Sequence, residues 1–227
     1  MSESVLLSEI AEQPAVLERL LTEAAPEVEA IAAAIRASGI HHVVIAARGS
    51  SDNAARYAQY LFGAHNRFTV TLATPSLVTR YRTPPVMSGA LVVGISQSGE
   101  SPDLVAVVEE GRRQGCPTLA VTNVAGSPLT AAADHTIVLR AGQERSIAAT
   151  KTYTAQLAAL AMLSTAIAQK DEWRRELAAI PAFVAAAHAV DREAVLAAAH
   201  ALQHAGHGVV LGRGFNFATA FEAALKA

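Results

Sequence analysis

Residues 91–102 read LVVGISQSGESP, an apolar run that passes into a polar turn and then a proline. The run Leu91–Ile95 is continuously apolar, as expected of a strand that is covered on both faces of a sheet. Pro102, with Ser101 directly before it, predicts the start of a helix that continues to about Gln114. The stretch therefore predicts a buried strand, a turn at its carboxyl end and a helix that leads away from the turn.

Four more apolar runs alternate with stretches that suit helices: Val43–Ala47, Val70–Ala73, Thr118–Thr122 and Thr136–Leu139. Regular alternation of strands and helices predicts a parallel sheet with right-handed crossovers. We therefore expect an α/β fold, built as a three-layer αβα domain around a five-stranded parallel sheet.

Helical stretches flank the predicted sheet on both sides in the sequence. Residues 6–39 predict two helices with a break near Pro26, and residues 150–168 predict one long, mostly buried helix. Residues 171–205 are helical in pattern, with a break at Pro181. The expected division is N-terminal helices at 1–40, an α/β domain at 41–170 and a helical linker at 171–207.

One sequence pattern occurs twice. Residues 44–49 read VIAARG and residues 209–214 read VVLGRG, and an alanine-rich helical stretch follows each. Each copy predicts a strand, a tight glycine turn and a helix, so we expect a second copy of the domain to begin at Gly208 and occupy 208–227. One strand and one helix cannot bury their own apolar faces. We therefore expect the sequence to be part of a longer, two-domain protein.

The composition excludes several classes of protein. The formal net charge is −2 and no basic cluster occurs, so we expect neither nucleic-acid binding nor binding to an anionic membrane. Cys116 is the single cysteine and the eight histidines show no metal-ligand spacing, which argues against disulfides and a metal site. No signal peptide or membrane-length apolar run is present, so we expect a cytoplasmic protein.

The turn at Ser96–Ser101 has two interpretations. It could be an ordinary serine turn that caps a helix, or an anion site in which hydroxyls and a helix N-terminus hold a phosphate group. Gly49-Ser50-Ser51 repeats the arrangement after the first predicted strand. Two serine turns at the ends of parallel strands can share one anion, so the pair favours a phosphate site.

These motifs together resemble a known family. The two serine turns resemble those of the sugar isomerase (SIS) domain family, within it most closely the isomerase half of the glutamine–fructose-6-phosphate aminotransferases. Three further segments resemble that half in the same order along the chain: Glu9–Pro14, Asn123–Ser127 and Ala141–Tyr153. The resemblance implies a flavodoxin-like fold.

The resemblance also implies a role for individual residues. The implied phosphate-binding residues are Ser51, Ser96, Gln97, Ser98 and Ser101. The implied sugar-binding residues are Gly49, Ser50, Ile147 and Ala148. Glu222 and Lys226 match the start of the helix that carries catalytic groups, whereas the glutamate that transfers the proton would follow after the last residue, Ala227. No metal or organic cofactor is implied.

The implied function is binding of fructose 6-phosphate or glucosamine 6-phosphate, and aldose–ketose isomerisation with loss or transfer of an amino group. The alternative is a non-catalytic regulator that binds a sugar phosphate. Arg48 stands where the aminotransferases have a cysteine, Ala149 stands where they have a serine, and no glutamine-hydrolysing half precedes the domain, which argues against glutamine-dependent synthesis. We expect a homodimer, and from these 227 residues alone binding without turnover.

Overall fold

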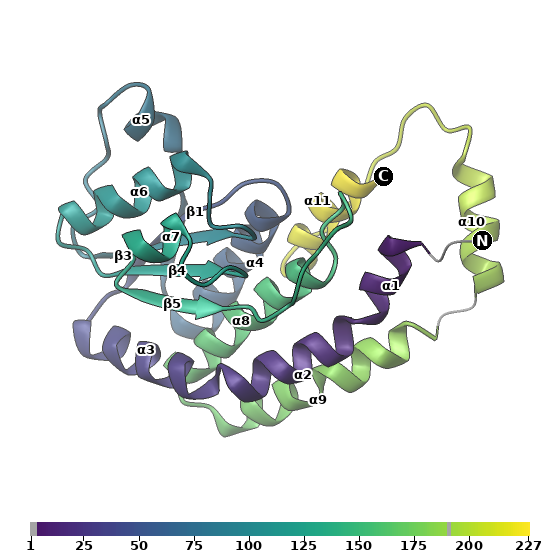
Figure 1. Cartoon of the computed structure of the whole chain (residues 1–227), viewed down its shortest axis with the longest axis horizontal. Helices are drawn as coiled ribbons and strands as arrows, with labels where there is room; N and C mark the ends of the chain where they lie inside the picture. Colours follow the sequence, from purple (N-terminus) through teal and green to yellow (C-terminus); the bar gives the residue numbers. More distant parts are fainter. Residues whose placement is uncertain (1–3, 190–191) are drawn as a thin grey trace.

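The computed structural model describes residues 4–189 and 192–227. Its core is a five-stranded, all-parallel sheet with the strands in the order β2-β1-β3-β4-β5 (Figure 1). Each observed strand end lies within one residue of its predicted position, so the predicted sheet is confirmed. The strands are β1 (His42–Ala46), β2 (Thr69–Leu72), β3 (Ala90–Ser96), β4 (Thr118–Thr122) and β5 (His135–Val138).

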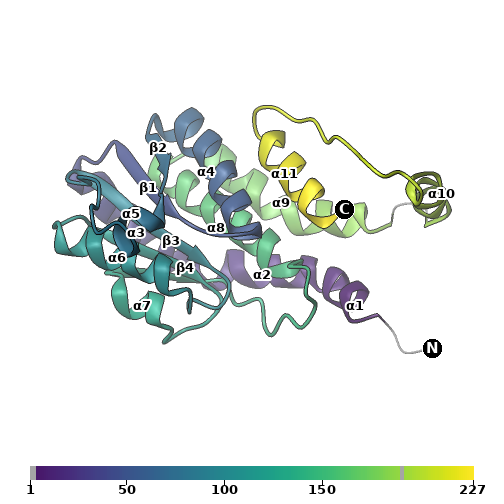
Figure 2. The same ribbon diagram turned by 90° about the horizontal axis from the view of Figure 1, so that it is seen from above.

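Helices cover both faces of the sheet, which gives the predicted three layers (Figures 1 and 2). Alternate residues of β1 point to opposite faces. Val43 and Ile45 join the larger apolar core, whereas Val44 and Ala46 join the smaller one. The larger core is closed by α3 (Ala25–Ser38), α4 (Ser50–Asn66) and α8 (Lys151–Ala168), and the smaller by α5 (Pro75–Thr79), α6 (Pro102–Arg113) and α7 (Pro128–Ala132).

The order of the strands creates a crevice between two neighbouring strand ends. Helix α4 leads from β1 outward to β2, whereas α6 leads from β3 in the opposite direction to β4. The two helices also lie on opposite faces of the sheet. Their N-termini therefore diverge at the carboxyl ends of β1 and β3, which is where open α/β sheets bind ligands.

The N-terminal segment forms three helices rather than the two that were predicted. They are α1 (Val5–Ala11), α2 (Gln13–Glu23) and α3. Pro14 and Pro26 are the second residues of α2 and α3. Proline has no backbone N–H and disfavours helical conformation in the residue before it, so each proline begins a new helix. The break near Pro26 is confirmed, and the break before Pro14 went unrecognised in the sequence.

The predicted helix break at Pro181 is wrong. Pro181 lies inside α9 (Asp171–Ala187), which runs alongside α2 (Figure 1). Ile180 and Val184 pack against the larger core, and this packing holds the helix together across the missing backbone hydrogen bond. The next helix, α10 (Arg192–Leu202), begins after a gap in the described residues.

The strand predicted at the start of 209–214, before the glycine turn, is also not formed. Residues 207–213 have no regular secondary structure, and Val209 and Leu211 are more than four-fifths exposed. A strand needs a neighbour to satisfy its backbone groups, and the described residues supply none beside this segment. The glycine turn and the helix that follow do form, as Gly214 with φ 61° and α11 (Asn216–Lys226). That residues 208–227 begin a second domain stays a prediction.

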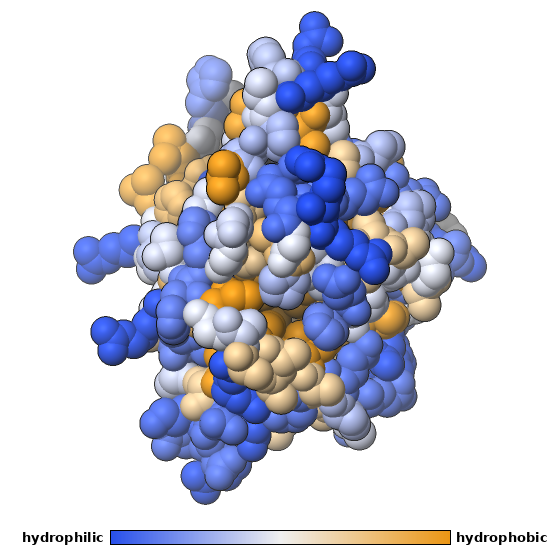
Figure 3. Space-filling model, turned by 90° about the vertical axis from the view of Figure 1, so that its left-hand side faces the viewer, coloured by the Kyte–Doolittle hydropathy of each residue, from blue (hydrophilic) through white to orange (hydrophobic). Residues whose placement is uncertain are grey.

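The end of the sheet at which the strands begin faces the viewer in Figure 3. Its surface is mostly hydrophilic, with apolar side chains in separate patches. Among the helices in the described ranges, none has both the length and the apolar character that crossing a bilayer requires. The predicted binding residues lie at the other end, where the strands finish.

Candidate functional site

The turn between β3 and α6 carries four of the predicted phosphate-binding residues. The Oγ of Ser96 accepts a hydrogen bond from the Gly99 amide at 3.1 Å, and that of Ser98 accepts one from the Glu100 amide at 3.2 Å. Ser101 is the N-cap of α6, but its side chain makes no capping hydrogen bond. Because none of the three hydroxyls donates within the described residues, their protons can serve a ligand at the helix N-terminus.

Gly99 lets this turn fold tightly. Its φ is 68°, in the left-handed region, and an added Cβ would lie 2.6 Å from the Cβ of Ser127 and overlap the Ser127 hydroxyl. Only glycine adopts this φ without strain and also fits beside Ser127. The turn is thereby packed closely against Ser127.

The turn between β1 and α4 reaches the same crevice. Gly49 is the N-cap residue of α4 with φ 57°, and Ser50 and Ser51 are the first two helical residues. Because Ala46 of β1 pairs with Gly94 of β3, the two strands end side by side and their turns face each other. The two serine turns, which are 47 residues apart counted from Gly49 to Ser96, therefore meet in space.

A cavity of about 730 Å³ opens between the two turns. It brings together every predicted phosphate-binding and sugar-binding residue, together with the predicted catalytic Lys226. Further lining residues are Arg48, Thr152 and Gln156, which were not predicted as ligand contacts. The predicted residues that line the cavity are Gly49, Ser50, Ser51, Ser96, Gln97, Ser98, Ser101, Ile147, Ala148 and Lys226.

The remaining predicted catalytic residue, Glu222, lies behind Ser50 and does not line the cavity. Its carboxylate accepts hydrogen bonds from Ser50 Oγ at 2.8 Å and from Asn53 Nδ2 at 2.7 Å. The Nζ of Lys226, one helical turn further on, lies 3.2 Å from the same carboxylate and 3.2 Å from Ser50 Oγ. Burial raises the pKa of the neighbouring Tyr153, and the Glu222 charge raises it further. Glu222 and Lys226 of α11 therefore lie beside the serine turn that follows β1.

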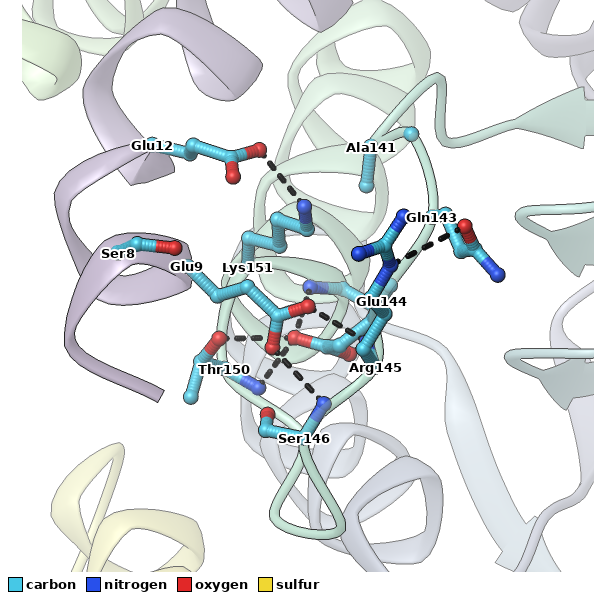
Figure 4. A network of polar contacts seen from close by, with 12 residues as sticks. Ser8, Glu9, Glu12, Ala141, Gln143, Glu144, Arg145, Ser146, Thr150 and Lys151 are labelled. Atoms are coloured by element: carbon cyan, nitrogen blue, oxygen red, sulfur yellow. Dashed lines mark hydrogen bonds and ion pairs between the residues drawn. The ribbon is translucent and has the colours of Figure 1, made fainter. Parts of the chain in front are cut away.

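The loop between β5 and α8 carries Ile147 and Ala148 to the edge of the cavity. Ile147 is fully exposed, so its own side chain does not hold the loop in place. The Glu144 carboxylate accepts hydrogen bonds from the Thr150 amide at 2.6 Å and the Thr150 hydroxyl at 2.8 Å (Figure 4). It accepts a further one from the Thr152 hydroxyl. Glu144 thereby caps the start of α8 and fixes the end of the loop.

Glu9 of α1 holds the same loop, and Glu12, between α1 and α2, pairs with the first residue of α8 (Figure 4). Glu9, which is 3% exposed, accepts hydrogen bonds from the Arg145 amide at 2.5 Å and the Ser146 amide at 3.1 Å. Burial alone would raise the pKa of Glu9, but these hydrogen bonds and the Lys151 charge outweigh burial and hold that pKa below its usual value. Lys151, nearly fully buried, pairs with Glu12 at 2.6 Å instead of reaching the cavity.

Arg48 and Gln156 are the cavity residues with the most distinct chemistry among those that sequence reasoning missed. Arg48 pairs with Asp103 in the first turn of α6, so the pair bridges the two serine turns. Gln156 donates from Nε2 to Ser51 Oγ at 2.9 Å. A polar residue inside the apolar stretch of α8 was the one signal that could have identified Gln156.

The strand order and the cavity at the switch point between two serine turns define a doubly wound α/β protein of the flavodoxin-like class. Residues 38–166 match the SIS domain, more than half of the chain, so the chain belongs to the SIS domain family. The family predicted from the motifs is confirmed.

Similar proteins show which members of the SIS domain family this chain resembles. The glutamine–fructose-6-phosphate aminotransferase of Aeropyrum pernix is 35% identical over 235 residues, which cover 97% of this chain and 37% of that protein. The chain thus spans little more than a third of that relative's length. A crystal structure from Silicibacter pomeroyi, provisionally named a phosphosugar isomerase, is 36% identical with a TM-score of 0.93 and covers 99% of this chain and 68% of that one.

The isomerase half of an aminotransferase is also similar to this chain in structure and in sequence. The C-terminal domain of the glucosamine-fructose-6-phosphate aminotransferase of Francisella tularensis is 29% identical, with a TM-score of 0.85. The match covers 99% of this chain and 66% of that domain. The fold and the sequence therefore agree on an aminotransferase-like SIS domain.

Proposed function

We propose that this chain binds a hexose or hexosamine 6-phosphate in the cavity between its two serine turns. The observation that carries the proposal is the convergence on one cavity of two helix N-termini with serine hydroxyls, among which those of Ser96, Ser98 and Ser101 donate no hydrogen bond within the described residues. Such a site binds a dianionic phosphate through hydrogen-bond donors and helix dipoles, without a dedicated lysine. Fructose 6-phosphate fits the names of the aminotransferase relatives, and the family resemblance also implies glucosamine 6-phosphate.

The proposed reaction is aldose–ketose isomerisation with loss or transfer of an amino group, carried out by the complete protein. The phosphate subsite would anchor the substrate while Lys226 and Glu222 act near the sugar, so that binding energy at the phosphate orients the reacting carbons. The test is an assay of the complete protein with glucosamine 6-phosphate, and with fructose 6-phosphate plus ammonia. Consumption of either supports the reaction, and consumption of neither contradicts it.

A second candidate is a regulator that binds a sugar phosphate without converting it. It is favoured by one feature, since the Glu222 carboxylate is engaged by Ser50 and Asn53 and lies outside the cavity lining. Binding without turnover by the complete protein would select this candidate. A homodimer and a cytoplasmic location stay predictions.

A further inference from the structure

Gln156 is a buried polar residue of the cavity whose hydrogen bonding is half complete. It lies in the middle of α8, is 1% exposed and lines the cavity. Its Nε2 donates to Ser51 Oγ at 2.9 Å, whereas its Oε1 is buried and has no hydrogen-bond partner within the part of the chain that the structure describes. A buried acceptor without a donor is costly, so this oxygen points to a ligand group.

The hydrogen bond to Ser51 sets the direction in which that hydroxyl can act. A serine hydroxyl has one proton and two lone pairs. Because the Gln156 amide occupies a lone pair of Ser51 Oγ, the Ser51 proton does not point at Gln156 and can turn to the cavity. A phosphate dianion accepts hydrogen bonds and donates none, so the arrangement suits a phosphate oxygen at Ser51.

The free Oε1 has the opposite requirement. It needs a donor, which a phosphate dianion does not have but a sugar hydroxyl does. Thr152, one helical turn before Gln156 on the same face of α8, also lines the cavity, but its hydroxyl is already bonded to Glu144. The unmet acceptor in this wall of the cavity is therefore that of Gln156.

We propose that Gln156 is a ligand-binding residue, which fixes the Ser51 hydroxyl as a donor to the phosphate and accepts a hydrogen bond from a hydroxyl of the sugar. The inference rests on the proposed sugar-phosphate function. It predicts two separable effects, one on the phosphate through Ser51 and one on the sugar through Oε1.

Calorimetric titration of the 227-residue chain with inorganic phosphate and with fructose 6-phosphate tests the inference. Gln156→Glu places a carboxylate against Ser51, which would draw the serine proton away from the phosphate and repel the anion. We expect the Kd for both ligands to rise at least tenfold, roughly the size of one hydrogen bond to a charged group. Ser164→Ala, a buried change on the same helix outside the cavity, is the control and should leave both Kd values unchanged.

Gln156→Met supplies a second, uncharged variant. It should weaken fructose 6-phosphate more than inorganic phosphate, since only the sugar brings a hydroxyl to Oε1. Because Gln156 acts on phosphate through Ser51, the double variant Ser51→Ala/Gln156→Met should bind inorganic phosphate no more weakly than Ser51→Ala alone. A purely structural role would instead make the two losses add.

The outcomes separate the two proposals. If the wild-type chain binds fructose 6-phosphate and the folded Gln156 variants bind it equally well, the role of Gln156 is overturned and the proposed function stands. If the wild-type chain binds neither ligand, both proposals fail. Additive losses in the double variant also overturn the role of Gln156.

Discussion

The Ser50 hydroxyl donates a hydrogen bond to the Glu222 carboxylate at 2.8 Å, across a sequence separation of 172 residues. The bond ties the last helix of the chain to the first serine turn, and Lys226 contacts both residues. Helix α11 thus packs against α4 (Figure 2), so that Lys226 lines the cavity and Glu222 lies behind Ser50. The predicted catalytic pair therefore lies beside the predicted phosphate-binding serines of the first turn.

The buried Glu222 carboxylate should stabilise the docking of α11. Glu222→Gln keeps the shape but removes the charge, so the contacts with Ser50 and Lys226 weaken. We expect the free energy of unfolding to fall by about 1–3 kcal/mol, measured by urea denaturation. Glu172→Gln, an exposed change in α9, should shift it by less than about 0.5 kcal/mol. Equal small effects of the two changes would contradict the importance of the Ser50 contact.

Gly99 should be essential to the phosphate turn for two reasons that a matched variant can separate. Gly126 has a similar φ of 76° but open space around it, so Gly126→Ala adds backbone strain of about 1–2 kcal/mol and no overlap. Gly99→Ala adds the overlap with Ser127, which should cost about 1–3 kcal/mol more. Calorimetry should show that Gly99→Ala loses phosphate binding and that Gly126→Ala retains it. Full phosphate binding by Gly99→Ala would show that phosphate binding does not depend on the close packing of Gly99 against Ser127.

The hydrogen bonds that Glu9 accepts from the Arg145 and Ser146 amides should make the free energy of unfolding depend on pH. Because the pKa of Glu9 is lowered in the folded state, its ionised form contributes stability above the unfolded pKa of about 4.3, and that contribution is lost as the pH falls through the lower folded value. We expect Glu9→Gln to be less stable than wild type at pH 7 by about 1–3 kcal/mol. The difference should shrink when unfolding is measured at progressively lower pH below about 4.3. A difference that is constant with pH would contradict the charged anchor.

The same variant should change ligand preference, because Glu9 holds the loop that carries Ile147 and Ala148. Glu9→Gln should weaken fructose 6-phosphate binding while inorganic phosphate binding is kept, since the serine turns are untouched. Titration with the two ligands measures this directly. Parallel losses for both ligands would indicate a general loss of structure in place of a displaced sugar loop.

Arg48 should assist anion binding at the rim of the cavity. It is largely exposed and paired with Asp103, so Arg48→Ala should leave the melting temperature nearly unchanged. Removing a positive charge beside the phosphate turn should weaken phosphate binding severalfold and reduce the sensitivity of that binding to salt. Arg113→Ala, which removes an exposed guanidinium that pairs with the buried Glu110 on the same helix as Asp103 but away from the cavity, is the control. If both variants bind phosphate like wild type, Arg48 has no part in the site.

The sequence predicted the sheet and the turn that follows β3 well because both depend on local patterns. Continuous apolar runs such as Leu91–Ile95 specify buried strands, and the serine-glycine turns at Ser96–Ser101 and Gly49–Ser51 mark the helix starts. The roles implied by the family resemblance fell on residues that line one cavity, with Glu222 directly behind it.

The features that were missed or misjudged depend on distant contacts. The bond between Gln156 and Ser51 joins residues 105 apart, and those of Glu9 reach residues 136 and 137 positions away. Packing along α2 kept α9 intact through Pro181, and the strand expected at the start of 209–214 has no pairing neighbour among the described residues. None of these outcomes is encoded in the short stretch of sequence on which the prediction rested.

The central claim is that the two serine turns bind the phosphate of a sugar phosphate. Its most direct test is calorimetric titration of the chain with fructose 6-phosphate and with fructose, repeated on the double variant Ser98→Ala/Ser101→Ala. We expect wild type to bind fructose 6-phosphate, fructose not to bind measurably, and the double variant to lose at least about tenfold in affinity. Equal binding of fructose and fructose 6-phosphate, or unchanged affinity in the double variant, would contradict it.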